Sequence, residues 1–353
     1  MTSRRHVLQL LGSAGALLAA GGCSPAAPPA PTLLGVKGQL PKAWLKQLPS
    51  PWRSQLLEGP QQVLALVEQG TAEPGLLALG DGWAQQLDRA RLQPLQAEAL
   101  LEGLAPFAAA PSRLFGPPGS RPVAFPWAFG TWLLLLRNRA DLERQRSRGW
   151  EVLLDPSLKG KLVLPSSPRV VIDLALRQLG LSSTDPASLE DPRLLQQVRE
   201  LVNQAQSLDE SQGINLLLAG DAEAAVVPSH QAIPLLQKDP RLTAVLPESG
   251  SPFWWQLLLR PAPLGSLSDS PPLPLEWLRD GFTEPLVDRL LAGGWVPPLP
   301  RPQLEGVLRR WPSRLRPLLL PPEAVLKRCS NLVAFTPLER KRWQAIWDQA
   351  LSA

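Results

Sequence analysis

The sequence predicts an α/β fold built on an open, mostly parallel sheet, divided into about two domains of ordinary size. Strand-like runs at residues 32–40, 52–57 and 75–79 alternate with helix-like segments, which is the pattern of βα units in parallel sheets. About 330 residues follow the first 23, and a chain of that length can bury a separate core in each of two domains.

The composition is that of a folded globular protein, with 44% hydrophobic and 19% charged residues. The formal net charge of +5 is spread along the chain as single arginines, so it describes a solvated surface and argues against nucleic-acid binding. Only Cys23 and Cys329 are present, which excludes a disulfide framework. We also expect no metal cluster and no cofactor.

Residues 1–23 resemble an export signal. Arg4 and Arg5 precede an apolar run at 8–20 that is too short to span a bilayer, and the arginine pair indicates the twin-arginine route. Cys23 follows small residues, as in the lipobox of bacterial lipoproteins, which predicts lipidation; cleavage without lipidation is the alternative. The Pro/Ala-rich residues 24–31 suit a semi-stiff tether behind a membrane anchor. These features predict a periplasmic protein, anchored if Cys23 is modified.

The first three units each place a helix after a strand. The run at 32–40 ends at Pro41 and precedes a helical pattern around Trp44, and the run at 52–57 leads into a helix at 61–69. The strand at 75–79 ends at Gly80-Asp81-Gly82, before a helix around 83–87. Because open parallel sheets bind ligands beyond the carboxyl ends of their strands, the residues after these strands are candidate site residues.

A second lobe begins after the apolar run at 132–136. Residues 149–165 read as a helix, a turn and a strand, and Ser167 is the expected N-cap of a helix over 169–179 that Gly180 closes. A strand-turn-strand is expected around 214–227 and a further strand at 242–246. From Leu273 on, amphipathic helical patterns interrupted by prolines return to the first lobe.

Three segments resemble the periplasmic polyamine-binding proteins of the bacterial solute-binding superfamily. Residues 150–180 show the family's Trp, its Lys-Gly turn at Lys159-Gly160, and a helix ending Ala-Leu-Arg-Gln-Leu-Gly at 175–180. Residues 246–254 (Leu-Pro-Glu-Ser-Gly-Ser-Pro-Phe-Trp) and 125–131 (Phe-Pro-Trp-Ala-Phe-Gly-Thr) are similar to its two crossing strands. In order and spacing, these segments cover most of residues 32–330.

The resemblance implies the two-lobed, type II periplasmic-binding-protein fold, with crossing strands near Phe129 and Trp254 as the hinge. Lobe 1 would comprise 32–130 and 258–353, and lobe 2 would comprise 131–257. It also implies a solute-binding component of an ABC-type importer that closes on a small molecule and is recognised by a membrane permease. The family has no catalytic residues.

The resemblance implies that several residues of this chain line a ligand pocket. Trp254 matches a pocket tryptophan, Trp83 falls where the family has a tyrosine, and Trp295 lies at another aromatic position. Aromatic faces attract alkylammonium groups by cation–π contact. Asp81 stands where the family has a serine, and Lys37 and Gln39 correspond to residues of a loop that lines the pocket.

The family's acidic clamp is missing at its usual positions, where this chain has Ser167, Val170 and Gln256. A buried ammonium group without a carboxylate partner costs several kcal/mol, so only Asp81 remains to replace the lost charge. We therefore expect a ligand other than an ordinary polyamine. Ser166, Ser167 and the N–H groups of that helix start could hold an anion, helped by Arg169 or Lys37; alternatively, Ser167 only caps the helix.

Other classes of function have less support in the sequence. Ferric-ion binding proteins share the architecture but often use tyrosine pairs, and this chain has no tyrosine. Ser229-His230 lacks an oriented third group, so the sequence does not predict an enzyme; His230 fits a pocket-edge loop or helix start. The main alternative is an interaction or assembly lipoprotein that kept the fold without transport.

Overall fold

In the described part of the chain, ten strands pair in the order β2-β1-β3-β9-β4-β7-β5-β6, with β10 on β9 and β8 on β4. The structure is a computed structural model that describes residues 30–70, 74–210, 212–262, 271–332 and 336–352. The predicted signal, Cys23 and most of the tether lie outside these residues. Residues 31–353 form one compact unit.

The strands are β1 (Thr32–Val36), β2 (Arg53–Leu57), β3 (Leu76–Gly80), β4 (Ala124–Arg137), β5 (Leu162–Leu164), β6 (Ala205–Leu208), β7 (Ala224–Pro228), β8 (Leu242–Val245), β9 (Pro252–Leu259) and β10 (Ser330–Asn331). The α-helices are α1 (Lys42–Leu45), α2 (Pro60–Glu68), α3 (Asp81–Ala84), α4 (Glu98–Glu102), α5 (Ala109–Ser112), α6 (Ala140–Glu143), α7 (Pro168–Gln178), α8 (Leu194–Gln204), α9 (Gly213–Ala219), α10 (Ser229–Leu236), α11 (Leu275–Asp280), α12 (Leu286–Ala292), α13 (Arg301–Leu308), α14 (Arg316–Leu319), α15 (Glu323–Leu326) and α16 (Pro337–Leu351). Short 3-10 helices cover Arg89–Arg91, Pro106–Ala108, Arg146–Leu154, Pro156–Leu158 and Pro186–Glu190.

The first three strand–helix units form as the sequence predicts. Strand β1 pairs in parallel with both β2 and β3, and α1, α2 and α3 follow the three strands in turn. Strands β1 and β3 are almost wholly buried, because apolar side chains occupy both faces of each. Their carboxyl ends therefore lie side by side, and α3 begins directly at Asp81 where β3 ends.

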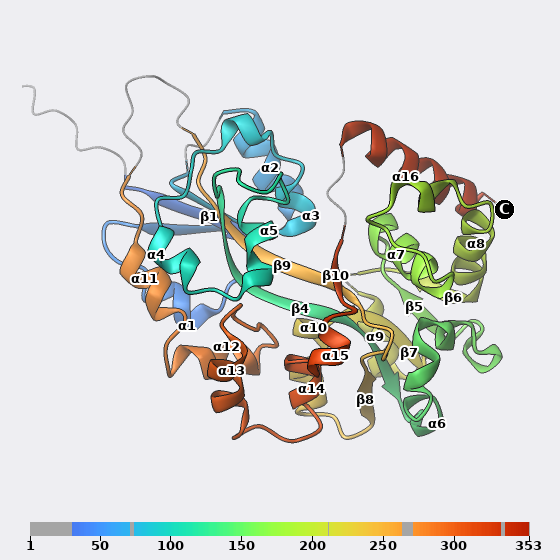
Figure 1. Cartoon of the computed structure of the whole chain (residues 1–353). Helices are drawn as coiled ribbons and strands as arrows, with labels where there is room; N and C mark the ends of the chain where they lie inside the picture. The colour runs from blue at the N-terminus through green and yellow to red at the C-terminus, as the bar shows by residue number, and fades with distance from the viewer. Residues whose placement is uncertain (1–29, 71–73, 211, 263–270, 333–335, 353) are drawn as a thin grey trace, which may run out of the picture. The chain divides into compact units, whose positions relative to one another are not determined.

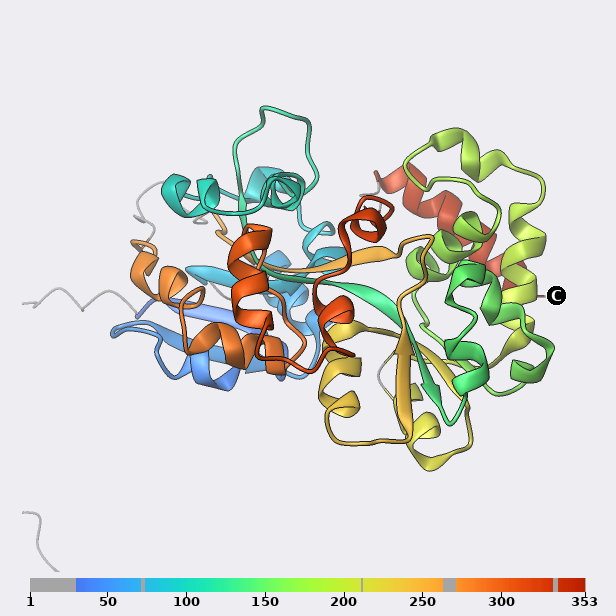
Figure 2. The same ribbon diagram turned by 60° about the horizontal axis from the view of Figure 1, so that its bottom comes forward.

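Strands β4 and β9 connect the two halves of the sheet. The first part of β4 pairs antiparallel with β9, with Gly130 opposite Trp254, and its last part pairs with β7 and β8. Strand β9 also pairs with β3, so the two long strands run beside each other through the middle of the sheet (Figures 1 and 2). Both predicted crossing segments lie in these strands, and 13 of the 14 residues of β4 are buried.

The second half of the sheet contains β7, β5 and β6, which pair in parallel. Helix α7 follows β5, with Pro168 as its first residue, and Gly180 beyond its end has φ +70°, as a helix-closing glycine requires. The predicted strand-turn-strand around 214–227 is wrong in its first part. Residues 213–219 form α9, and only β7 is a strand, because a short apolar run fits a buried helix as well as a strand.

The C-terminal helix α16 packs against α7 and α8 (Figure 1). Trp343, Trp347 and Ala350 are buried at helical spacing, so they form the face that contacts these helices. A capping box between Thr336 and Glu339 starts the helix, with the Glu339 backbone N–H donating to Thr336 Oγ1 at 3.2 Å. The predicted lobe boundaries placed this helix with lobe 1, whereas α7 and α8 belong to the predicted lobe 2.

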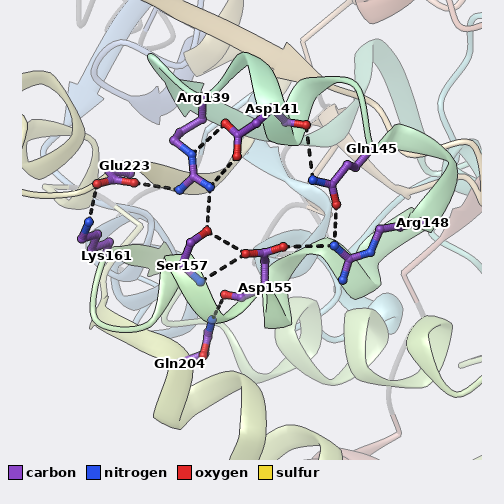
Figure 3. A network of polar contacts seen from close by, with 9 residues as sticks. All are labelled: Arg139, Asp141, Gln145, Arg148, Asp155, Ser157, Lys161, Gln204 and Glu223. Carbon is purple, nitrogen blue, oxygen red and sulfur yellow. Dashed lines mark hydrogen bonds and ion pairs between the residues drawn. The ribbon is translucent and has the colours of Figure 1, made fainter.

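A polar network fixes the connections around the second half of the sheet (Figure 3). Arg139, just after β4, donates to Asp141 at 2.8 Å, to Glu223 at 2.7 Å and to the Ser157 hydroxyl at 2.6 Å. Gln204 at the end of α8 donates to the backbone carbonyl of Asp155 at 2.6 Å. The ends of β4 and α8 are therefore tied to the same turn. No helix among the described residues is long and apolar enough to cross a membrane.

Candidate functional site

A cavity of about 570 Å³ opens where the strands of both halves end. On one side it is lined by the end of β3 and by α3, and on the other by the start of α7 and the start of α10 after β7. Strand β9, helix α16, the residues after β6 and Trp132 of β4 also line it. A crevice at the carboxyl ends of parallel strands is the usual place for a ligand in an open α/β sheet.

Six of the eight predicted ligand-binding residues line this cavity: Gln39, Asp81, Trp83, Ser167, Trp254 and Gln256. Lys37 and Trp295 are not among the lining residues. Lys37 forms an ion pair with Glu58 on the surface, and both side chains are mostly exposed. Trp295 lies behind the lining, with its ring 6.3 Å from and nearly parallel to the ring of His230. The structure thus brings together side chains from segments more than 200 residues apart.

Asp81 and Arg169 form an ion pair that joins the α3 side of the cavity to the α7 side. Arg169 Nη1 donates to Asp81 Oδ2 at 2.8 Å, and the two side chains are only 12% and 7% exposed. Asp81 Oδ1 also accepts the backbone N–H of Trp255 at 3.1 Å, and Arg169 Nη2 donates to the Leu332 carbonyl at 2.7 Å. Asp81 is therefore already neutralised by a cation of the protein itself.

The cavity also contains two carboxylates that no sequence motif indicates, Asp209 and Glu210. Both follow β6, so the expectation that Asp81 alone could replace the lost acidic clamp is wrong. The backbone N–H of Gln212 donates to Asp209 Oδ1 at 2.9 Å. Their position directly after a strand was the available signal, because open α/β sheets bind ligands beyond the strand ends.

Glu210 lies against the start of α7. Glu210 is partly exposed to solvent, and desolvation by the surrounding protein raises its pKa. The Ser167 backbone N–H donates to this carboxylate and lowers the pKa, while the nearby Asp209 charge raises it. The anion site predicted at this helix start is thus partly filled by an acidic side chain of the protein.

Ser167 occupies the N-cap position of α7, but its hydroxyl makes no capping hydrogen bond. The helix begins with Pro168, which needs no acceptor, and the Ser167 N–H is directed to Glu210. Val170, at the other vacant clamp position, lines the cavity and is 2% exposed. The Ser167 hydroxyl therefore accepts no hydrogen bond from the first turn of α7, in contrast to the hydroxyl of a capping serine.

Close packing around two glycines positions Trp254 and His230. A Cβ on Gly130 would lie 2.2 Å from Ser229 Oγ and 2.5 Å from the Trp254 ring. The indole N–H of Trp254 donates to Ser229 Oγ at 3.3 Å, and the His230 ring meets the Trp254 ring edge-on at 4.5 Å between centroids. On the other side, Gly294 has φ +75° and touches the His230 backbone. Only glycine permits both approaches.

His230 is the second residue of α10, so the predicted helix start is confirmed. Burial lowers the pKa of His230 to about 4. Its Nδ1 has no hydrogen-bond partner among the described residues, and the Ser229 hydroxyl is engaged by Trp254. Within the same residues, no group of three or more His, Cys, Asp or Glu side chains is arranged to hold a metal ion.

Solved structures of type II periplasmic binding proteins share this arrangement of strands and helices. The spermidine/putrescine ABC transporter substrate-binding protein of Streptococcus pneumoniae matches 91% of this chain and 98% of its own, with a TM-score of 0.70 and 16% identity. The iron-bound protein HitA of Pseudomonas aeruginosa matches 91% of this chain and 98% of its own, with a TM-score of 0.61 and 12% identity. The chain therefore has the two-lobed α/β fold of this class.

The sequence itself is similar to the spermidine/putrescine-binding periplasmic protein of Salmonella typhimurium. The two are 27% identical over 127 residues, which are 35% of this chain and 36% of that protein. The chain thus matches about a third of the length of its curated relatives. No protein-family model matches the sequence.

Proposed function

We propose that the protein is the extracytoplasmic solute-binding component of an ABC-type importer and that it holds a small polar solute in the cavity between α3 and α7. The observation that carries the proposal is the convergence of α3, α7, α10 and β9 on one cavity at the strand ends. The similarity to polyamine-binding proteins points to a ligand with at least one ammonium group. We also propose a periplasmic location, with Cys23 as the lipidated residue of a protein exported by the twin-arginine route.

The lining suits binding of an organic cation. Trp83 and Trp254 offer aromatic faces, and each cation–π contact contributes roughly 0.5 to 2 kcal/mol. Asp209 and Glu210 supply negative charge, while Gln39, Ser167 and Gln256 supply polar groups. We propose binding without catalysis, because no nucleophile, base and orienting group meet among the described residues of the cavity.

A thermal-shift screen of the purified protein against a metabolite library tests the proposal. A true ligand at about 100 times its Kd stabilises the folded state by about 2.7 kcal/mol, so one chemical class should raise Tm clearly above the rest. The library should include diamines, triamines, amino acids and small organic anions. A flat response across the library would contradict transport and favour an interaction role.

Substitution then locates the binding site. Trp254→Leu should remove the ligand-dependent rise in Tm, because it deletes an aromatic wall of the cavity. Trp311→Leu is the matched control, since Trp311 does not line the cavity and its loss should leave the rise in place. If both variants respond alike, the ligand binds elsewhere. Titration calorimetry of the wild type gives the Kd.

A further inference from the structure

We infer that the ligand is an amino-acid-like molecule, which carries a carboxylate as well as an ammonium group, and that Arg340 on α16 recognises the carboxylate. This inference rests on the proposed function, because it names the substrate class of the same cavity. It follows from the charges of the cavity, from the position of Arg340 and from buried donors that a polyamine cannot satisfy.

The charges of the cavity match a ligand that carries both signs of charge better than a polyamine, which carries only positive charge. The lining of the cavity contains the carboxylates of Asp81, Asp209 and Glu210 and the guanidinium groups of Arg169 and Arg340. Asp81 and Arg169 neutralise each other, and the lining also contains Glu210 and Asp209, which bear negative charge, and Arg340, which bears positive charge. A diamine brings two positive charges into a cavity whose lining already includes Arg340, and like charges placed side by side repel.

Arg340 is placed to meet an anionic group. It lies in the first turns of α16, whose residues Trp343 and Gln344 also line the cavity. The packing of α16 on α7 and α8 holds this helix against the site. Arg340 is exposed to solvent at the edge of the cavity, and no ion pair joins it to a carboxylate among the described residues. A guanidinium group presents paired N–H donors that match a carboxylate, so a ligand carboxylate would complete the site.

Two lining side chains also contain donors that need an acceptor. Trp132 is 7% exposed, and its indole N–H is buried without a partner among the described residues. The side-chain nitrogen of Gln85 is in the same situation. An unsatisfied buried donor costs about 1 to 3 kcal/mol. Gln39, which also lines the cavity, has the opposite need, because its buried Oε1 acceptor lacks a donor among the described residues. A protonated polyamine could satisfy only this acceptor, whereas a ligand with an ammonium group and a carboxylate offers both donors and acceptors.

Matched pairs of ligands test the inference, because ornithine and putrescine differ only by a carboxylate, as do lysine and cadaverine, and arginine and agmatine. We expect the carboxylate-bearing member of at least one pair to bind about tenfold or more tightly in titration calorimetry, which is the contribution of one charge-assisted hydrogen-bonded contact. A tighter diamine in every pair would overturn the inference. If none of the six compounds binds while another compound of the metabolite library raises Tm, the inference fails and the proposed function stands. A flat response to the whole library contradicts the proposed function itself.

Substitution of Arg340 assigns the preference to this residue. Arg340→Gln should weaken binding of the amino acid about tenfold and strengthen binding of its diamine partner, because a repelling charge is removed. Arg342→Gln is the matched control on the same helix, since Arg342 pairs with Glu190 outside the cavity, and it should leave both affinities unchanged. An equal loss of both ligands in Arg340→Gln would contradict the role. Trp132→Phe, which keeps a ring but removes the donor, should weaken the amino acid independently.

Discussion

At the scale of single residues, the cavity is set by side chains whose neighbours lie far away in the sequence. His230 contacts Trp254 and Trp295, and Gly130 makes room for the Trp254 ring. The aromatic position of Trp254 could be predicted from its local motif, because the motif is short and continuous. The burial of His230 could not, since it depends on packing between α10, β9 and the Gly294 turn.

His230 makes stability depend on pH. Its folded-state pKa of about 4 lies below the ordinary value of 6.5 because burial disfavours the charged ring. The unfolded state therefore takes up a proton first, and the stabilising effect present above pH 6.5 is lost as pH falls towards 4. His230→Phe should abolish this loss, about 3 kcal/mol by linkage. Urea denaturation of both proteins from pH 7.5 to 4 measures it, and parallel stability curves would contradict the assignment.

At the scale of elements, the features that depend on local sequence could be predicted, whereas the contacts between distant segments could not. The alternation of β1, α1, β2, α2 and β3 could be predicted because strand and helix periodicities are local. The Thr336–Glu339 capping box is an equally local signal for the start of α16. The position of α16 against α7 and α8, and with it Arg340 in the cavity, depends on contacts between distant segments. The same reason explains why Asp209 and Glu210 were missed.

The network around Arg139 gives the second half of the sheet an acid-sensitive connection (Figure 3). The hydrogen bond from Arg139 holds the pKa of Asp141 at about 2, below its ordinary value of 3.8. This depressed pKa means that the stabilising contribution is complete above about pH 4 and is lost as pH falls towards 2. Asp141→Asn should be less stable than the wild type at pH 7, and the two should converge near pH 2. Urea denaturation at several pH values checks this, and a constant difference would contradict it.

At the scale of the whole molecule, the Asp81–Arg169 pair links the two sides of the cavity. Both side chains are largely shielded from solvent, and each lies in the first turn of a helix that follows a strand of a different half of the sheet. Neither sequence motif indicated the pairing, because the two residues are 88 positions apart. A charge left alone at this depth is costly, so the pair should be sensitive to single substitutions and tolerant of paired ones.

Arg169→Met should lower the free energy of unfolding by about 3 kcal/mol, since it leaves Asp81 buried without its cation. The double variant Asp81→Asn with Arg169→Met should recover part of that loss, because no unpaired charge remains. Urea denaturation of the wild type, both single variants and the double variant gives the coupling energy. Additive effects of the two single substitutions would show that the pair does not act as a unit.

The late position of β9 in the sequence determines when the sheet can be completed during synthesis. Strands β1 to β3 emerge before residue 81, but β9, which lies between β3 and β4, begins only at Pro252. Until then, β3 and the first part of β4 have open, apolar edges that can pair with other chains. Sheet closure must wait for contacts of large sequence separation, and such topologies fold slowly. A nascent chain of this protein therefore exposes these edges until β9 is inserted.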